Sequence, residues 1–249
     1  MSGHSKWATI KHKKGAADAA RAKQFAKLLR QVEVAAREGG GDPTMNASLR
    51  AAIQKARDSS VPMDNIERAT KRGAGETEGV RYESVMYEGY SAGGVAMLVD
   101  ALTDNRNRTG AEVRSIFSKN GGAMAEPGAV SWQFERKGVI MVPASVGEEQ
   151  LMEVALEAGA EDIAEQGDVF QVTCAPADLS ALRTALEEAG IAIDSAETTM
   201  LPQNSVPVTE ENVAKQVLRM MDALEDNDDV QNVYANFDIS DELFTTVLA

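Results

Sequence analysis

The sequence predicts an α+β protein, in which an N-terminal three-helix bundle precedes two α+β domains and one of these domains is inserted into the other. Apolar residues recur at helical spacing up to a glycine-rich stretch that begins at Gly73, and β-forming segments follow it. Residues 138–204 have the strand–helix–strand–strand–helix–strand order of a ferredoxin-like domain. A further helix and strand follow this segment, and they would supply the second helix and the last strand that the domain before the segment lacks.

Three amphipathic segments predict the bundle. The first helix spans 15–37, and a run of glycines at 39–41 ends it. Asp42 followed by Pro43 predicts the N-cap and first turn of a second helix, and a third begins at 60–62. The apolar stripe of the first helix consists of Phe25, Leu28, Leu29, Val32 and Ala36.

The two α+β domains follow from the order of the remaining elements. The middle segment reads as strand, strand, helix and strand, at 82–90, 95–102, 109–119 and 130–134. The ferredoxin-like segment has strands at 139–142, 160–164, 169–174 and 191–199 and helices at 148–157 and 179–188. The helix 209–225 and the strand 230–237 would complete the middle domain. We therefore expect three domains, at 1–77, at 78–137 together with 205–249, and at 138–204.

Charge is distributed very unevenly along the chain. The formal net charge of −14 argues against a nucleic-acid partner, but residues 1–77 carry 15 Lys and Arg against 8 Asp and Glu. Residues 138–204 carry 1 basic residue against 13 acidic ones. Such asymmetry indicates a polyanion-binding end. The acidic domain is either a solubilising shell or a dock for a basic protein partner.

The segment 6–14, KWATIKHKK, is the most informative motif. Its lysines can neutralise phosphates, and His12 can donate to phosphate when it is protonated. Trp7 could stack on a base or pack onto the bundle. Three cations of the first helix lie opposite its apolar stripe and would extend this basic surface. The predicted contacts are Lys6, Trp7, Lys11, His12, Lys13, Lys14, Lys23, Lys27 and Arg30.

A second candidate contact is the loop 103–109, with Arg106 and Arg108 between asparagines. Arginines are good phosphate or base donors, but the loop could equally be an ordinary polar connection with Asn or Asp capping the next helix. Lys71 and Arg72 are better explained as cations at a helix C-terminus, where the macrodipole favours them.

Catalytic signatures are missing from the sequence, so we expect a protein that is not an enzyme. Residues 89–93 match Gly-x-Ser-x-Gly, but in a predicted hairpin, so a hydrolase is only a remote alternative. Cys174 and two distant histidines give no zinc spacing, and we expect no metal and no cofactor. No apolar run of eighteen residues or secretory signal is apparent, and with one cysteine this favours a cytoplasmic protein without membrane contact.

Five stretches of the chain resemble the YebC/PmpR family. They are MSGHSKWATIKHKKGAADAARAKQF, DPTMNASLRAAIQKARDSSVPMDNIERATKRG, YEGY, LTDNRNRT and EPGAVSWQFERKG. The resemblance covers essentially the whole chain and is strongest in residues 1–140. It implies a three-domain architecture, with the family's basic segment at Lys6, Lys11, Lys13 and Lys14 and its arginine loop at Arg106 and Arg108.

The resemblance also implies a function. Family members are described as probable DNA-binding transcriptional regulators, and relatives that include a mitochondrial translational activator act on translation at the ribosome. We therefore expect a DNA-binding transcriptional regulator. The alternative is a translation factor that binds ribosomal RNA or the ribosome. The basic face of the first helix has Lys and Arg but no Asn or Gln, which favours phosphate contact over reading of base edges.

Overall fold

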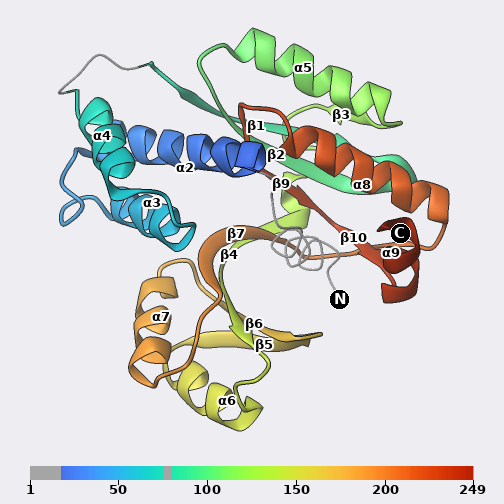
Figure 1. Cartoon of the computed structure of the whole chain (residues 1–249). Coiled ribbons are helices and arrows are strands. Elements are labelled where there is room, and N and C mark those ends of the chain that lie inside the picture. Colours follow the sequence, from blue (N-terminus) through green and yellow to red (C-terminus); the bar gives the residue numbers. More distant parts are fainter. Residues whose placement is uncertain (1–17, 76–79, 249) are drawn as a thin grey trace. The chain divides into compact units, whose positions relative to one another are not determined.

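The computed structural model describes residues 18–75 and 80–248 (Figure 1). One compact unit spans Gln133–Asn204, and the chain on either side of it forms the other. Helices come first, and mixed α+β elements with antiparallel sheets follow them. The predicted fold class is therefore confirmed, including the insertion of one α+β part into the other.

The helical part consists of α2 (Asp18–Gly39), α3 (Ala47–Asp58) and α4 (Met63–Gly73). Their apolar stripes meet in one cluster, as the periodicity of the sequence predicted. The fully or almost fully buried members include Leu28, Val32, Ala36, Leu49, Ile66 and Ala69.

The N-cap of α3 is Asn46, so the prediction that Asp42 and Pro43 form the N-cap and first turn of this helix was wrong. The Asn46 side chain accepts a hydrogen bond from a first-turn amide of α3 at 3.0 Å. Its amide group donates to the carbonyl oxygens of Ala35 and Gly40, both at 2.8 Å. Asn46 therefore caps α3 and satisfies carbonyls at the end of α2, whereas Asp42 only closes the turn before it by accepting from the Thr44 amide at 2.8 Å.

The central sheet has the strand order β3-β1-β2-β9, and all of its neighbours are antiparallel. Its strands are β1 (Glu83–Tyr90), β2 (Ala96–Thr103), β3 (Ala123–Ala125) and β9 (Val230–Ala235). Helices α5 (Arg106–Lys119) and α8 (Glu211–Glu225) pack on the same face of this sheet, where Phe117, Met97 and Met221 share one core (Figure 1). Because β9 pairs with β2, the C-terminal segment completes a sheet that begins before the insertion.

Small elements near the C-terminus were not predicted. They are β8 (Val206–Val208), which pairs in parallel with β10 (Phe237–Ile239), and helix α9 (Asp241–Leu248). The predicted strand 230–237 is interrupted at Asn236, whose buried side chain accepts from the Ala96 amide at 2.7 Å. Strands of three residues are too short to show alternation, so no periodic signal marks them in the sequence.

The predicted strand 130–134 was wrong because its amides bond to a side chain. Glu88 is buried on β1 and accepts from the amides of Gly128 and Val130 at 2.7 Å and from that of Ser131 at 2.9 Å. Burial opposes the negative charge of Glu88, but these backbone hydrogen bonds outweigh it and lower the pKa of the carboxyl group. The segment therefore forms a turn and the short helix η2 (Ser131–Gln133) instead of a strand.

The inserted unit has the elements β4 (Phe134–Pro143), α6 (Glu148–Glu157), β5 (Ala160–Gln166), β6 (Val169–Cys174), α7 (Leu179–Glu188) and β7 (Ser195–Pro202). The antiparallel order β5-β6-β4-β7 is that of the predicted ferredoxin-like fold. The last strand begins later than predicted, because Ile191 is buried in the core outside any strand. Cys174 is also buried, and burial raises the pKa of its thiol.

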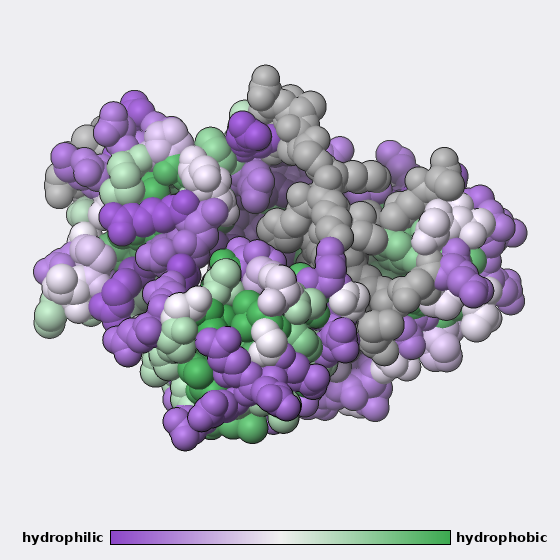
Figure 2. Space-filling model, turned by 60° about the horizontal axis from the view of Figure 1, so that its bottom comes forward, coloured by the Kyte–Doolittle hydropathy of each residue, from purple (hydrophilic) through white to green (hydrophobic). Residues whose placement is uncertain are grey.

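The surface seen in Figure 2 is largely hydrophilic, and its apolar residues gather in small patches. No helix in residues 18–75 and 80–248 combines the length and the apolarity needed to cross a membrane.

The close packing of β1 against α5 gives a test of this fold. A Cβ atom at Gly89 would lie 2.5 Å from Phe117 Cε1 and 2.7 Å from the Ala123 carbonyl oxygen. Gly89→Ala should therefore lower the free energy of unfolding by about 1–3 kcal/mol, measured by urea denaturation.

The control is Gly110→Ala within α5, where the atom nearest to the added Cβ, Tyr87 Oη, is 3.6 Å away. This variant should gain about 0.5–1 kcal/mol from helix propensity, and equal effects of the two changes would contradict the packing described.

Candidate nucleic-acid interface

The predicted contact residues fall into two groups. Six of them lie outside the described residues, namely Lys6, Trp7, Lys11, His12, Lys13 and Lys14. The other five lie on two helices, with Lys23, Lys27 and Arg30 on α2 and Arg106 and Arg108 on α5. Four of these five converge on the turn at 225–229 between α8 and β9, which we call the acidic turn. Arg106 is exposed and does not take part in these contacts.

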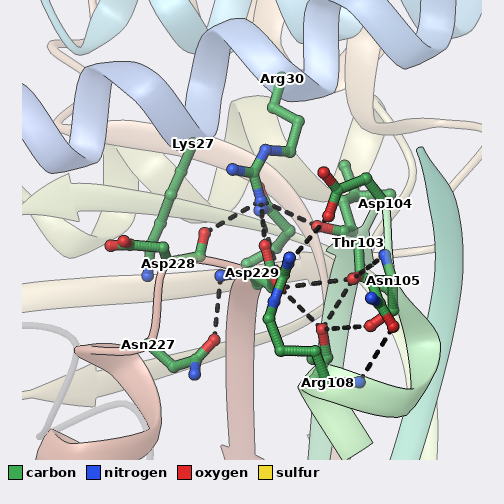
Figure 3. A network of polar contacts seen from close by, with 12 residues as sticks. Lys27, Arg30, Thr103, Asp104, Asn105, Arg108, Asn227, Asp228 and Asp229 are labelled. Carbon is green, nitrogen blue, oxygen red and sulfur yellow. Dashed lines mark hydrogen bonds and ion pairs between the residues drawn. The ribbon is translucent and has the colours of Figure 1, made fainter. Parts of the chain in front are cut away.

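Asp229, the last residue of the acidic turn, is the centre of this network (Figure 3). Its side chain is only 8% exposed. The Arg30 guanidinium donates to Asp229 Oδ1 at 3.0 Å, and that of Arg108 donates to Oδ2 at 2.6 Å. One buried carboxylate thus joins α2 and α5 to the start of β9 through charge-assisted hydrogen bonds.

Two hydroxyl groups complete the surroundings of Asp229. The Thr109 hydroxyl donates to Asp229 Oδ2 at 2.7 Å, and Thr103 Oγ1 lies 3.3 Å from the same oxygen. Burial raises the pKa of Asp229, but the hydrogen bonds from Thr109 and Arg108 and the charges of the two arginines outweigh burial and lower it. The hydrogen bonds that Arg108 donates to Asp229 and Asp104 raise the pKa of Arg108 in turn. The network therefore holds Asp229 ionised.

Lys23 and Lys27 bind the C-terminal end of α8. Lys27 Nζ donates to the Glu225 carbonyl oxygen at 2.6 Å, and Lys23 Nζ donates to the Asp226 carbonyl oxygen. Lys23 Nζ also lies 3.2 Å from Asp226 Oδ1 and 3.4 Å from Asp228 Oδ1. Cations are favoured at this position because the last carbonyls of a helix are unsatisfied and carry partial negative charge.

Arg30 makes further contacts with backbone and ring atoms. Its Nη1 atom donates to the carbonyl oxygens of Leu102 at 2.8 Å and Asp228 at 3.1 Å. The guanidinium lies 4.8 Å from the centre of the Tyr82 ring, within range of a cation–π contact. Arg30 is therefore held by three kinds of partner, and its orientation is fixed.

The arginines of the predicted loop 103–109 lie in the first turn of α5. Asn105 is the N-cap, and its side chain accepts from the Arg108 amide at 3.1 Å. Capping of the next helix by Asn was one of the two interpretations of this loop. The Arg108 side chain also donates to Asp104 Oδ1 at 2.8 Å, so both of its described partners are carboxylates of the same chain.

A polar cleft of about 450 Å³ lies beside the network. It is lined by acidic, basic and neutral residues, which are Lys23, Arg30, Tyr82, Asp104, Arg108, Glu112, Asp226, Asn227, Asp228 and Asp229.

The sequence interpretation missed the acidic side of this arrangement. No local pattern connects Asp228 and Asp229 with Arg30, their basic partner on α2, because it lies about 200 positions away along the chain. The basic face of α2 was expected to contact phosphates, and in this structure it contacts carboxylates and carbonyls of its own chain. Other cations of the bundle are exposed to solvent, namely Arg21, Arg50, Arg57, Arg68 and Lys71.

Fold and network together define an α+β protein whose helical bundle is joined to its central sheet by ion pairs. Residues 5–76 match the sequence model described as the TACO1/YebC protein N-terminal domain, and residues 82–237 match the one described as the TACO1/YebC second and third domain. The chain belongs to the TACO1/YebC family.

Close relatives have the same extent. A "probable transcriptional regulatory protein" of Geobacter sulfurreducens is 57% identical over 242 residues, which cover 97% of this chain and 98% of that protein. One of the same name from Thermobifida fusca is 56% identical over 99% of this chain and 100% of the relative. The crystal structure of a conserved hypothetical protein from Aquifex aeolicus matches with a TM-score of 0.86 and 48% identity, over 95% of this chain and 98% of that one.

Replacement of Asp229 tests the network. Asp229→Asn keeps the shape but removes the charge between two arginines, and it should lower the free energy of unfolding by about 1–3 kcal/mol at pH 7. The folded pKa of Asp229 is lowered, so its stabilisation is full above the unfolded value and is lost as the pH falls through the folded one. In urea denaturation the difference between variant and wild type should therefore shrink below about pH 4.

The control for this variant is Asp104→Asn, which removes a carboxylate that is 43% exposed and contacts the same Arg108. It should have a much smaller effect, because exposed ion pairs contribute little. Equal losses from the two substitutions, or a pH-independent loss at Asp229, would contradict the network.

Proposed function

We propose that this protein is a non-enzymatic regulator of gene expression that binds nucleic acid through its basic N-terminal part. The segregation of charge is the observation that carries the proposal, because 15 Lys and Arg face 8 Asp and Glu in residues 1–77 of a chain with a net charge of −14. Within the first 30 residues the count is 8 to 1. The relatives named "probable transcriptional regulatory protein" support a regulatory role.

The physical basis of binding is neutralisation of phosphates. Each Lys or Arg that contacts a phosphate releases condensed counterions, and this gain depends strongly on salt. The exposed cations of α3 and α4, with Lys11, Lys13 and Lys14, supply this charge. The acidic remainder of the chain repels phosphates, so contact is directed to the basic end.

DNA is the first candidate ligand, because the relatives are named as regulators of transcription. RNA at the ribosome is the second candidate. It is favoured by the hydrogen bonds that two amide side chains of the bundle make within the chain. Gln31 hydrogen-bonds Gln231 at 3.2 Å, and Gln54 bonds Asp58 at 2.9 Å. Because Gln and Asn are the usual readers of adenine edges, amides that are bonded within the chain favour phosphate and shape recognition.

A hydrolase finds little support. Ser91, the serine of the Gly-x-Ser-x-Gly match, is 5% exposed, and within the described part of the chain its hydroxyl has no hydrogen-bond partner. A serine nucleophile needs an adjacent base and access to substrate. Ser91 is better explained as a buried residue of the turn after β1.

Charge reversal of the basic segment tests the proposal. Lys11, Lys13 and Lys14 are replaced together by Glu, and binding to labelled duplex DNA and single-stranded RNA is titrated by fluorescence anisotropy across a salt series. Affinity should fall at least about tenfold at low salt. The slope of log affinity against log salt should weaken by about 0.9 for each duplex phosphate that the variant no longer neutralises.

A matched control changes the net charge equally elsewhere. Arg114, Lys119 and Arg219 are exposed on α5 and α8, and their replacement by Glu should have a much smaller effect. Unchanged affinity and slope in the Lys11, Lys13 and Lys14 variant would remove this segment from the mechanism. Sequence-dependent DNA binding at physiological salt would favour transcription, and retained binding to purified ribosomes alone would favour translation.

A further inference from the structure

Three cationic side chains on one face of α2 contact the same acidic turn. Lys23, Lys27 and Arg30 are spaced by four and three residues, so they project from one side of the helix. All three donate to residues of the acidic turn, and Figure 3 shows part of this contact. This side of α2 is the one that the sequence predicted to bind phosphates.

The partners of these cations have the chemistry of phosphate. Lys23 and Lys27 bind anionic carboxylate oxygens and carbonyl oxygens with partial negative charge at the end of α8. Phosphate oxygens accept hydrogen bonds from ammonium groups in the same way. A nucleic acid that contacts Lys23 or Lys27 therefore competes with the acidic turn for them.

The two ends of this contact differ in exposure. Arg30 and Asp229 are 18% and 8% exposed at their side chains, so that end is nearly closed to water. Lys23 is 35% exposed, and its partners Asp226 and Asp228 are 81% and 79% exposed. Exposed ion pairs are weak and screened by salt, so the Lys23 end can exchange partners while Arg30 stays anchored.

The contacts that Lys23, Lys27 and Arg30 make with the acidic turn are polar. Among the described residues, the buried cluster of the bundle and that of the central sheet have no member in common. The contact of Lys23 and Lys27 with the acidic turn itself consists of hydrogen bonds and ion pairs.

We propose that the acidic turn is an autoinhibitory contact, which occupies Lys23 and Lys27 in the free protein and competes with nucleic acid for them. This inference rests on the proposed function. The turn lowers the affinity of α2 for phosphate without preventing binding. A ligand with several adjacent phosphates displaces the turn, whereas an isolated anion competes poorly.

Neutralisation of the turn is the test. Asp226→Asn with Asp228→Asn removes the two exposed carboxylates that contact Lys23 but keeps the backbone acceptors. Binding of a labelled single-stranded RNA and a labelled duplex DNA is measured at low salt by fluorescence anisotropy. We expect affinity to rise about 3- to 10-fold, since two exposed ion pairs no longer compete.

Two controls separate competition from a general change of charge. Glu148→Gln with Glu149→Gln removes equal charge from the exposed first turn of α6, and it should change affinity less than about twofold. Combining the turn variant with Lys23→Gln and Lys27→Gln should abolish the gain, because the competed groups are then absent. Circular dichroism and thermal unfolding of each variant verify its fold.

The outcomes distinguish this proposal from the proposed function. A gain that requires Lys23 and Lys27 supports the autoinhibitory contact. A gain that persists without them, or that the α6 variant reproduces, overturns it while the proposed function stands. If neither wild type nor any variant binds RNA or DNA, the proposed function itself fails, and the inference fails with it.

Discussion

A carboxylate with almost no access to water needs compensating charge inside the protein, and Asp229 obtains it from Arg30 and Arg108. Because the arginines come from different helices, this requirement fixes the bundle and α5 to the residue that precedes β9. The Leu102 amide at the end of β2 also donates to the Asp229 carbonyl oxygen, at 2.9 Å. One residue thus joins segments that lie before and after the inserted domain.

This network shows how helix α2, which is rich in basic residues, is held within a strongly acidic chain. Arg30 is held in a buried network, and it positions α2 so that Lys23 and Lys27 reach the end of α8. The contacts of these three cations with the acidic turn are electrostatic, as hydrogen bonds and ion pairs. Polar contacts of this kind give orientation with less stability than apolar burial, and their exposed members respond to salt and to competing anions.

Much of the fold could be predicted because most elements carry their own periodic signal. The boundaries of α6, β6 and α7 were predicted to the residue, since apolar alternation or helical spacing marks them without help from distant residues. Predictions from local sequence were wrong where two possible N-cap residues lie close together. They were also wrong where backbone amides bond to a side chain instead of to a neighbouring strand. Asp42 and Asn46 are both residue types that suit an N-cap, and Asn46 also bonds the carbonyls of Ala35 and Gly40, which a local pattern does not show.

Only the basic residues of the candidate site were predicted from the sequence. Positive charge on α2 was evident in the sequence, but its partners in the acidic turn depend on tertiary structure. Glu88 illustrates the same limit, because nothing local to β1 indicates that its carboxylate binds the amides of Gly128, Val130 and Ser131. A double-mutant cycle on Arg30→Gln and Asp229→Asn, followed by urea unfolding at pH 7, measures the interaction on which this arrangement depends. We expect a coupling free energy of about 1–3 kcal/mol, whereas losses that add to within about 0.5 kcal/mol would contradict it.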